Sequence, residues 1–391
     1  MSRINSRVCL SARFGHGFAI GVLLVAAVLR SASARGTDPA HPGQSGNPPY
    51  PVSSFFHSLT WEWDTLANAA PGSDLWPVTW GEDNQLYTAW GDGGGFGGTD
   101  RQGRVSAGFG RIEGTPTNFH GYNVNGGEAP ENPAFLPGKG KVSGMVSVDG
   151  VLYANLNLQD GTWPDIHHAF AVSTNHGAAW NRLDWQFERG PGKFQPTKFI
   201  QFGRDYSGVP EALAGYVYLV GFKQPAAGEM AIDAYLARFP RTKLRLQNAL
   251  EFLHSAAPDA GPQWTREFSE SRPCFTDPNG GPLGSITYLS AFHRYLATTF
   301  HSGPGQLGVF DSPNPWGPWT TVAYYGNWGG MGTDGEGLSC EFPAKWMSSD
   351  GMTLWSVFSV YGDGGKKGIQ AHDRFNLIRV QLGLQSQESR R

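Results

Sequence analysis

Apolar and polar residues repeat a two-part pattern five times along this chain. Each time, a run of apolar, β-branched or aromatic residues is followed by a polar turn and then by a second run of the same kind. The paired runs are 75–80 and 86–90, 142–148 and 151–156, 197–202 and 216–222, 285–291 and 295–300, and 342–347 and 353–360. Asp-Gly separates the runs at 149–150 and at 350–351, and this dipeptide is a strong hairpin signal. The pattern predicts five β-hairpins.

The spacing of the hairpins indicates how they assemble. Their first strands begin near residues 75, 142, 197, 285 and 342, and a third apolar run follows most hairpins. Helical periodicity is weak, apart from a short stretch at 241–253. Multi-stranded repeats of variable length are typical of propeller blades. We therefore expect an all-β fold, a five-bladed β-propeller, with a β-sandwich or a β-helix as the alternatives.

The N-terminal residues have the features of an export signal. Three arginines (Arg3, Arg7 and Arg13) precede an apolar run at 18–29, and Ala-Ser-Ala follows at 32–34 as a cleavage site. The run is shorter than the roughly 18 apolar residues of a membrane-spanning helix, and no other stretch approaches that length. We expect a signal peptide and a secreted or periplasmic protein, with an uncleaved membrane anchor as the alternative.

Domain boundaries follow from composition. Residues 1–34 are the expected signal peptide. Residues 35–56 are rich in Pro, Gly and Ser without periodicity, which predicts a flexible linker. The propeller domain is then expected to cover residues 57–391.

Composition narrows the class of ligand. Four of the 30 basic residues and none of the 33 acidic ones lie in the first 34 positions, so the exported chain has a formal charge of −7. No basic face is evident, so we expect no nucleic-acid partner. With 13% aromatic and 16% charged residues, the chain suits neutral ligands rich in hydroxyl groups. Two cysteines remain after export, Cys274 and Cys340, and an oxidising compartment permits a bridge between them.

The hairpins also sort the polar residues into two faces. In a propeller, the inner strand of each blade runs along the central axis and the second strand returns beside it. Residues that precede the first strand or follow the second therefore share one face, which we call the front face; the hairpin turns lie on the opposite face, the turn face. On the front face we expect Asp74, Asp92, Lys141, Lys193, His301, Glu336, Glu341 and Asp363. The turn face collects acids that commonly stabilise turns: Glu82, Asp83, Asp149, Asp205 and Asp350.

Asp74 and Asp92 are the predicted catalytic pair, because they flank the two ends of the first hairpin. Cleavage of a glycosidic bond uses two carboxyl groups, one ionised and one held protonated. A neighbouring carboxylate or indole ring raises the pKa of a carboxyl group. The alternative role of Asp74 is hydrogen bonding at the start of its strand. For Asp92 the alternatives are support of the glycine loop 93–98 and calcium ligation together with Asp100.

Further residues are expected around this pair. A closed ring brings the fifth blade beside the first, so Glu336 and Glu341 are predicted to complete the catalytic set, with solvent-exposed acids as the alternative. The expected substrate contacts are Trp76, Trp80 and Trp90 as stacking faces for sugar rings, with Lys141, His301 and Lys345 as polar contacts. Core packing and surface charge are the alternatives for these six.

Metal and serine-nucleophile chemistry are not indicated. His167-His168 and His372-Asp373 lack a metal-ligand spacing, and no Gly-x-Ser-x-Gly motif is present. We expect no metal and no cofactor, apart from the calcium alternative at the glycine loop.

Several motifs resemble a known family. Asp-Leu-Trp-Pro-Val-Thr-Trp at 74–80, continued to Gly-Asp-Gly at 91–93, resembles secreted bacterial proteins that carry domain of unknown function 4185. The segments 148–153, 236–240, 315–319 and 342–351 resemble it too, so the likeness spans about residues 57–382. That family is similar to five-bladed furanosidase propellers, and some members are endo-acting D-arabinan hydrolases. The resemblance implies carbohydrate hydrolysis at the front face.

The combined expectation is a secreted, monomeric glycoside hydrolase that cleaves a furanose-rich, arabinan-like polysaccharide. Its partner is a polysaccharide or oligosaccharide, and the mature chain has no membrane span. The alternatives are a non-catalytic glycan-binding or scaffold propeller and a polysaccharide lyase, for which His301 or Lys141 is the candidate base.

Overall fold

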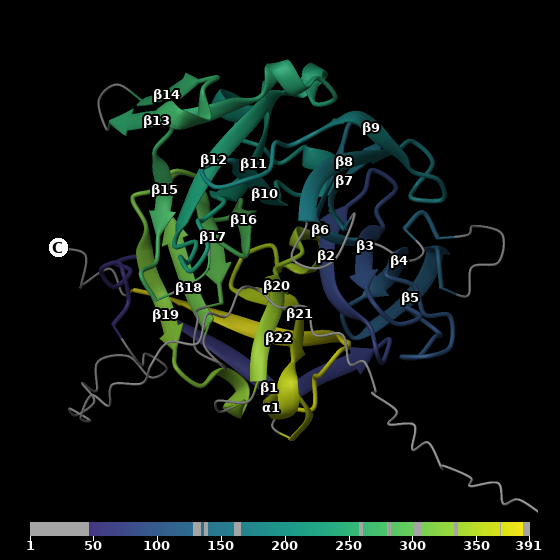
Figure 1. Cartoon of the computed structure of the whole chain (residues 1–391). Helices are drawn as coiled ribbons and strands as arrows, with labels where there is room; N and C mark the ends of the chain where they lie inside the picture. The colour runs from purple at the N-terminus through teal and green to yellow at the C-terminus, as the bar shows by residue number, and fades with distance from the viewer. Residues whose placement is uncertain are drawn as a thin grey trace, which may run out of the picture. The chain divides into compact units, whose positions relative to one another are not determined.

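The computed structural model describes residues 47–127, 134–136, 140–159, 166–257, 261–279, 281, 283–300, 307–331, 335–367 and 369–385. These residues form five antiparallel sheets, which are the blades of a β-propeller (Figure 1). The predicted fold class is confirmed. Within the described residues, no helix is both long and apolar enough to cross a membrane.

The first, second and fourth blades are four-stranded meanders, in which each strand pairs with the next along the chain. The first contains β2 (Asp74–Trp80), β3 (Leu86–Gly91), β4 (Ala107–Thr115) and β5 (Asn118–Asn125). The second contains β6 (Lys141–Val148), β7 (Val151–Gln159), β8 (Ile166–Ser173) and β9 (Asn181–Gln186). The fourth contains β16 (Ser285–Leu289), β17 (Arg294–Thr299), β18 (Leu307–Ser312) and β19 (Thr320–Tyr325).

The third blade is larger than the others. It contains β10 (Phe194–Phe199), β11 (Tyr216–Lys223), β12 (Asp233–Pro240), β13 (Glu251–Ala257), β14 (Gly261–Thr265) and β15 (Pro273–Thr276). Two single turns of 3₁₀ helix and the start of β13 occupy the stretch 241–253, where the sequence suggested a short helix. The long interval between the third and fourth hairpins therefore reflects two added strands.

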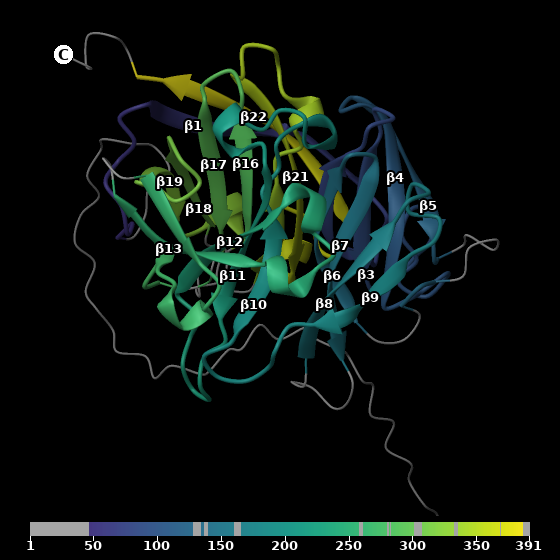
Figure 2. The ribbon, with the colours of Figure 1, turned by 90° about the horizontal axis from the view of Figure 1, so that it is seen from above.

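The fifth blade joins the two ends of the described chain. Its order is β20 (Gly335–Glu341), β21 (Thr353–Tyr361), β22 (Phe375–Leu384) and β1 (Phe56–Ala69). In both views the purple β1 lies beside the yellow β22 (Figure 1 and Figure 2). Each inner strand also contacts the next around the axis, and β20 contacts β2, so the ring is closed.

Two boundaries differ from the sequence expectation. The inner strand of the fifth blade is β20 and not the run 342–347, whose residues 344–346 form a 3₁₀ turn after Pro343. In addition, the propeller begins before residue 57. The backbone amide of Ser53 donates to Thr321, and the Tyr50 hydroxyl accepts from the Thr276 amide at 2.7 Å. The last part of the expected linker therefore packs on the third and fourth blades.

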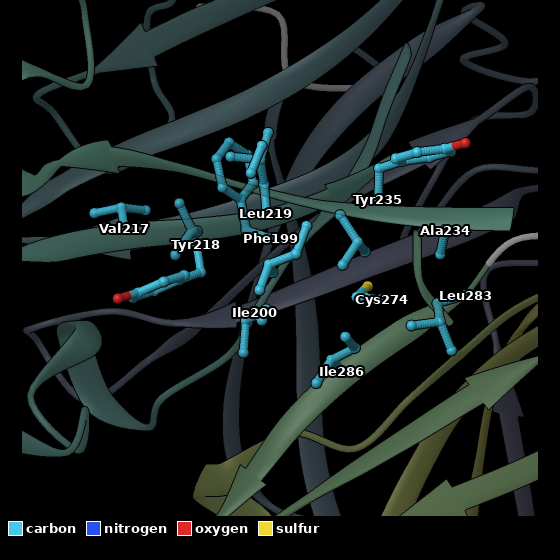
Figure 3. Packing of buried hydrophobic residues seen from close by; sticks show 14 of the residues in the cluster. Phe199, Ile200, Val217, Tyr218, Leu219, Ala234, Tyr235, Cys274, Leu283 and Ile286 are labelled. Carbon is cyan, nitrogen blue, oxygen red and sulfur yellow. The ribbon is translucent and has the colours of Figure 1, made fainter. Parts of the chain in front are cut away.

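Apolar side chains fill the space between blades. Figure 3 shows one such cluster, in which Phe199 and Leu219 of the third blade lie near Ile286 of the fourth. Cys274 belongs to this cluster, whereas Cys340 belongs to another one centred on the fifth blade. Both cysteines are buried and free, so the permitted bridge is not formed.

Candidate active site

Strand geometry brings three predicted residues together on the front face. Asp74 is the first residue of β2 and pairs with Gly91, the last residue of β3, so Asp92 follows directly. Lys141 is the first residue of β6 in the adjacent blade. A side chain at position 91 would collide with this group, because a Cβ there would lie 2.4 Å from Asp74 Oδ1. Glycine at 91 thus leaves room for the Asp74 carboxyl group.

Asp74 is nearly excluded from solvent. It is 7% exposed, and its Oδ1 has no hydrogen-bond partner among the described residues. Burial raises the pKa of Asp74 well above its ordinary value; Lys141 opposes this shift, and the negative charge of Asp92 adds to it. Because the ionised form is penalised here, the environment favours a protonated carboxyl group that can donate a proton.

Asp92 lies in the opposite kind of environment, among cations. Lys141 Nζ lies 2.5 Å from Asp92 Oδ1, and an Arg104 nitrogen lies 3.5 Å from Oδ2. Lys141 also donates to the carbonyl oxygen of Ser106 at 2.8 Å, which fixes the ammonium group in place. The Lys141 and Asp92 side chains are 17% and 23% exposed, so water screens their attraction only partly. The two carboxyl groups therefore differ, because Asp92 is paired with cations whereas Asp74 is buried.

The backbone around these carboxyl groups adopts costly conformations. Leu75 and Trp76 have φ values of 74° and 59°, at a β-bulge that interrupts the pairing of β2 with β3. Asp92 and Asp373 also have positive φ, 53° and 44°. Such conformations cost about 1–3 kcal/mol each in residues other than glycine, and they cluster at functional sites. Positive φ values also occur in the hairpin turns, at Asn84, Asp149 and Asp205, so the assignment of the site rests on its burial and charges.

Asp373 and Arg104 belong to the site although sequence reasoning did not select them. Asp373 precedes β22, and its carbonyl oxygen accepts from the Gly72 amide at 2.7 Å, two residues before Asp74. The pKa of the Asp373 carboxyl group is raised, mainly by burial. The neighbouring His372 opposes this shift, and the negative charge of Asp92 adds to it. The His372-Asp373 pair was visible in the sequence, but only the closure of the ring brings it to the first blade.

Arg104 lies between the two carboxylates that were considered as calcium ligands at the glycine loop. Its guanidinium group forms ion pairs with both Asp92 and Asp100, so an organic cation already lies between these two carboxylates. Among the residues that the structure describes, no group of three His, Cys, Asp or Glu side chains could hold a metal ion.

Glu341 does not join the pair. Because β20 ends at Glu341, this residue lies toward the turn face. The Ser339 hydroxyl contacts the carbonyl oxygen of Leu75, and Glu341 is two residues, about 7 Å, further along the strand. There it forms a buried ion pair with Lys198 of β10, with Nζ and Oε1 separated by 2.6 Å. Burial raises the pKa of Glu341, and the charge of Lys198 opposes that shift.

The side chains of the other two predicted residues, Glu336 and His301, lie outside the described part of the structure. Glu336 pairs with Tyr361 at the front-face end of β20, but its side chain lies outside the described part of the structure. His301 lies wholly outside the described residues.

The predicted stacking tryptophans are structural. Trp76 and Trp90 are 0% exposed and pack in the core with Phe96 and Phe375, so neither ring can contact a sugar. Their indole N–H groups donate to the carbonyl oxygens of Ser73, at 3.1 Å, and Gly93, at 3.2 Å. These bonds brace the residues next to Asp74 and Asp92. The two side chains therefore position the catalytic candidates without lining the site.

Trp80 and Lys345 lie at the other end of the propeller. Trp80 ends β2 and donates to the Asn84 side chain at 3.0 Å, in the hairpin turn. Burial lowers the pKa of Lys345, and the negative charges of Asp83 and Glu113 nearby oppose that shift. Both residues thus belong to the turn face, and their predicted contact with substrate at Asp74 is wrong.

Comparisons with known proteins give a likeness of fold. No protein-family model and no curated protein matches this chain, so membership of the domain of unknown function 4185 family stays a prediction. One similar solved structure is a GH43_1 enzyme from Xanthomonas citri, with 11% identity, a TM-score of 0.43, and 83% of this chain and 89% of that chain covered. Another is a family 117 glycoside hydrolase from Zobellia galactanivorans, with 9% identity, a TM-score of 0.41, and 83% and 90% covered. A likeness of fold does not assign an activity.

Proposed function

We propose that this protein is a secreted glycoside hydrolase that cleaves a furanose-rich, arabinan-like polysaccharide. Asp74 is the proton donor and Asp92 is its ionised partner. The observation that carries the proposal is the contrast between them: one carboxyl group is buried with a raised pKa, and its neighbour is paired with Lys141 and Arg104. Glycosidic cleavage needs two carboxyl groups in opposite protonation states.

Each residue then has a defined task. Asp74 gives its proton to the glycosidic oxygen as the bond to the anomeric carbon breaks, and the sugar leaves as an alcohol. Positive charge grows on the ring that remains, and the Asp92 carboxylate stabilises it. In one route Asp92 takes a proton from an attacking water, which inverts the anomeric centre. In the other, Asp92 bonds to the anomeric carbon, and a water that gives its proton to Asp74 then displaces Asp92, which gives net retention. The anomer that forms first, read by NMR, distinguishes the two routes.

The surrounding charges tune this pair. Lys141 and Arg104 hold the Asp92 side chain in place through two ion pairs. Asp373 adds negative charge that raises the pKa of Asp74 further. The arginine-rich start, apolar run and small-residue trio of residues 1–34 support secretion, and the motif at 74–93 supports a furanose substrate.

The test is release of reducing ends from arabinan, xylan and fructan. We expect release from arabinan, and a loss of about 10²–10⁴-fold in Asp74→Asn, because the general acid is gone. Asp350→Ala is the matched control, since Asp350 is an exposed acid in a hairpin turn, and it should retain activity within twofold. If the parent releases nothing from the three polymers, the proposal is wrong. An active Asp74→Ala/Asp92→Ala double variant would exclude these two residues.

Glycan binding without catalysis is the second candidate, and the engagement of Asp92 by two cations favours it. That function predicts binding of arabinan oligosaccharides with no turnover. A lyase is less well supported, because the Lys141 ammonium group is already engaged by Asp92 and the carbonyl oxygen of Ser106.

A further inference from the structure

A second concave region lies away from the carboxyl pair. It is a cavity of about 560 Å³ between the outer strands of the fourth and fifth blades, β19 and β1. Tyr325 ends β19 on the front-face side, and β1 runs toward the same side. We call this cavity the aromatic groove; its principal lining residues are Trp61, Trp63, Leu66, Tyr325, Asn327 and Trp328.

The aromatic groove has a rigid wall of indole rings. Trp61 and Trp63 are stacked, with centroids 6.3 Å apart and an interplanar angle of 26°. Trp328 meets Trp61 edge to face at 4.9 Å. Trp61 and Trp328 are buried, whereas Trp63 is only partly buried and so retains accessible surface. The partly accessible ring is held in place by the two buried ones.

Glycines bring the backbone close to this wall. Gly329 has φ +64°, and a Cβ there would lie 2.8 Å from the Trp63 ring, so only glycine lets the turn approach so closely. At Gly330 an added Cβ would meet no atom within 4 Å. The turn thus contacts Trp63 on one side and faces open space on the other.

The chemistry of the groove selects a neutral ligand with hydroxyl groups. None of the described residues that line it carries a charge. The groove is nevertheless not purely apolar. Asn327, which is exposed, contributes a side-chain amide to the lining, and an amide can donate to and accept from a hydroxyl group. Flat aromatic surface combined with a few polar groups suits a sugar ring, which has an apolar face and a hydroxyl edge.

The groove and the candidate active site are joined by two segments of chain. Ile369 lines the groove, and Asp373 follows it by four residues. Strand β1 carries Trp63 and leads directly to Asp74. We propose that the aromatic groove binds a neutral polysaccharide chain at sugars remote from the bond that Asp74 and Asp92 cleave. This inference rests on the proposed function for the cleavage itself, but binding in the groove does not require turnover.

The experiment measures binding of arabino-octasaccharide to the full chain by calorimetry, in the Asp74→Asn background so that the ligand stays intact. Trp63→Ala removes the stacking surface and should raise Kd about tenfold, which corresponds to about 1.4 kcal/mol. Trp80→Ala is the matched control, since Trp80 is also a partly buried tryptophan but lies on the turn face. It should change Kd by less than twofold. Leu66→Arg is a second variant, which places a long charged side chain in the groove and should weaken binding at least as much.

The outcomes separate this inference from the proposed function. If Trp63→Ala and Leu66→Arg both bind the octasaccharide as tightly as Trp80→Ala, the groove is not a subsite, whatever the parent hydrolyses. If they lose affinity while the parent releases no reducing ends, the groove stands and the hydrolase is refuted. If the Asp74→Asn background binds no octasaccharide and the parent cleaves none, both proposals fall.

Discussion

Replacing Asp74 by Asn should make the protein more stable while it greatly slows hydrolysis. Asn has nearly the same shape as a protonated Asp but cannot ionise. Burial raises the pKa of Asp74 well above the ordinary value of 3.8, so the folded state resists the ionisation that the unfolded chain accepts freely. Above pH 3.8, ionisation of Asp74 in the unfolded chain favours unfolding of the parent, whereas the variant has no carboxyl group to ionise.

The size and sign of this effect follow from linkage. Below pH 3.8 Asp74 is protonated in both states, so its stabilising contribution is complete. As pH rises from 3.8 toward the raised folded pKa, the unfolded chain binds fewer protons than the folded one, and the parent loses stability. One proton sets the steepest slope, about 1.4 kcal/mol per pH unit. For a domain of this size, a loss of about 1.4 kcal/mol lowers Tm by about 2 °C.

Thermal and denaturant unfolding of the parent and Asp74→Asn, measured between pH 4 and 8, test this reasoning. The stability difference should grow with pH in favour of the variant and level off at the folded pKa of Asp74. Asp350→Asn is the control. Local hydrogen bonds lower the pKa of that exposed acid, so it is ionised in both states above pH 5 and its difference should stay flat. A flat difference for Asp74→Asn would show that the buried carboxyl group is not held protonated.

Three further outcomes follow from the site and its surroundings. Asp373→Asn removes a charge that raises the pKa of Asp74, so the alkaline limb of kcat/KM should move to lower pH. Lys141→Met removes a charge that lowers this pKa, so the same limb should move to higher pH. Limbs that stay in place would show that Asp74 does not set them. Glu341→Gln should keep kcat/KM within threefold. It should lower the free energy of unfolding by about 3 kcal/mol, because it leaves the charge of Lys198 unpaired. A large loss of activity at unchanged stability would return Glu341 to the catalytic set. Trp76→Ala should cost about 3–5 kcal/mol in urea unfolding as a core cavity, and a cost below 1 kcal/mol would contradict its burial.

The blade pattern was predictable because each hairpin is local. Alternating runs joined by short turns specify strands whose partners lie only a few residues away. The fifth blade shows where this fails. The apolar run at 342–347 resembles a strand, but Pro343 and the contacts of Trp346 turn it into a 3₁₀ segment. Strand β1 was missed because β22, its partner, lies more than 300 residues further on.

The candidate site was predictable to a similar degree. The ends of the first hairpin and the start of the second blade identified Asp74, Asp92 and Lys141, since strand direction alone puts them on one face. The roles of Trp76 and Trp90 could not be predicted from the sequence, because only the packing between blades decides whether a ring faces the core or solvent. Asp373 reaches the site through contacts that form when the ring closes.

The pairing of β1 with β22 also means that the ring can close only after the last described strand has been synthesised. The first described strand has no sheet partner until the last one has been synthesised, so the fifth blade cannot be complete before then. Pairing between such distant segments is slow, and partly assembled rings expose unpaired strand edges that aggregate. Once β1 is seated, however, local fraying cannot open the circle unless a whole strand is removed. The lifetime of the folded protein should therefore be governed by its rate of unfolding rather than by its equilibrium stability.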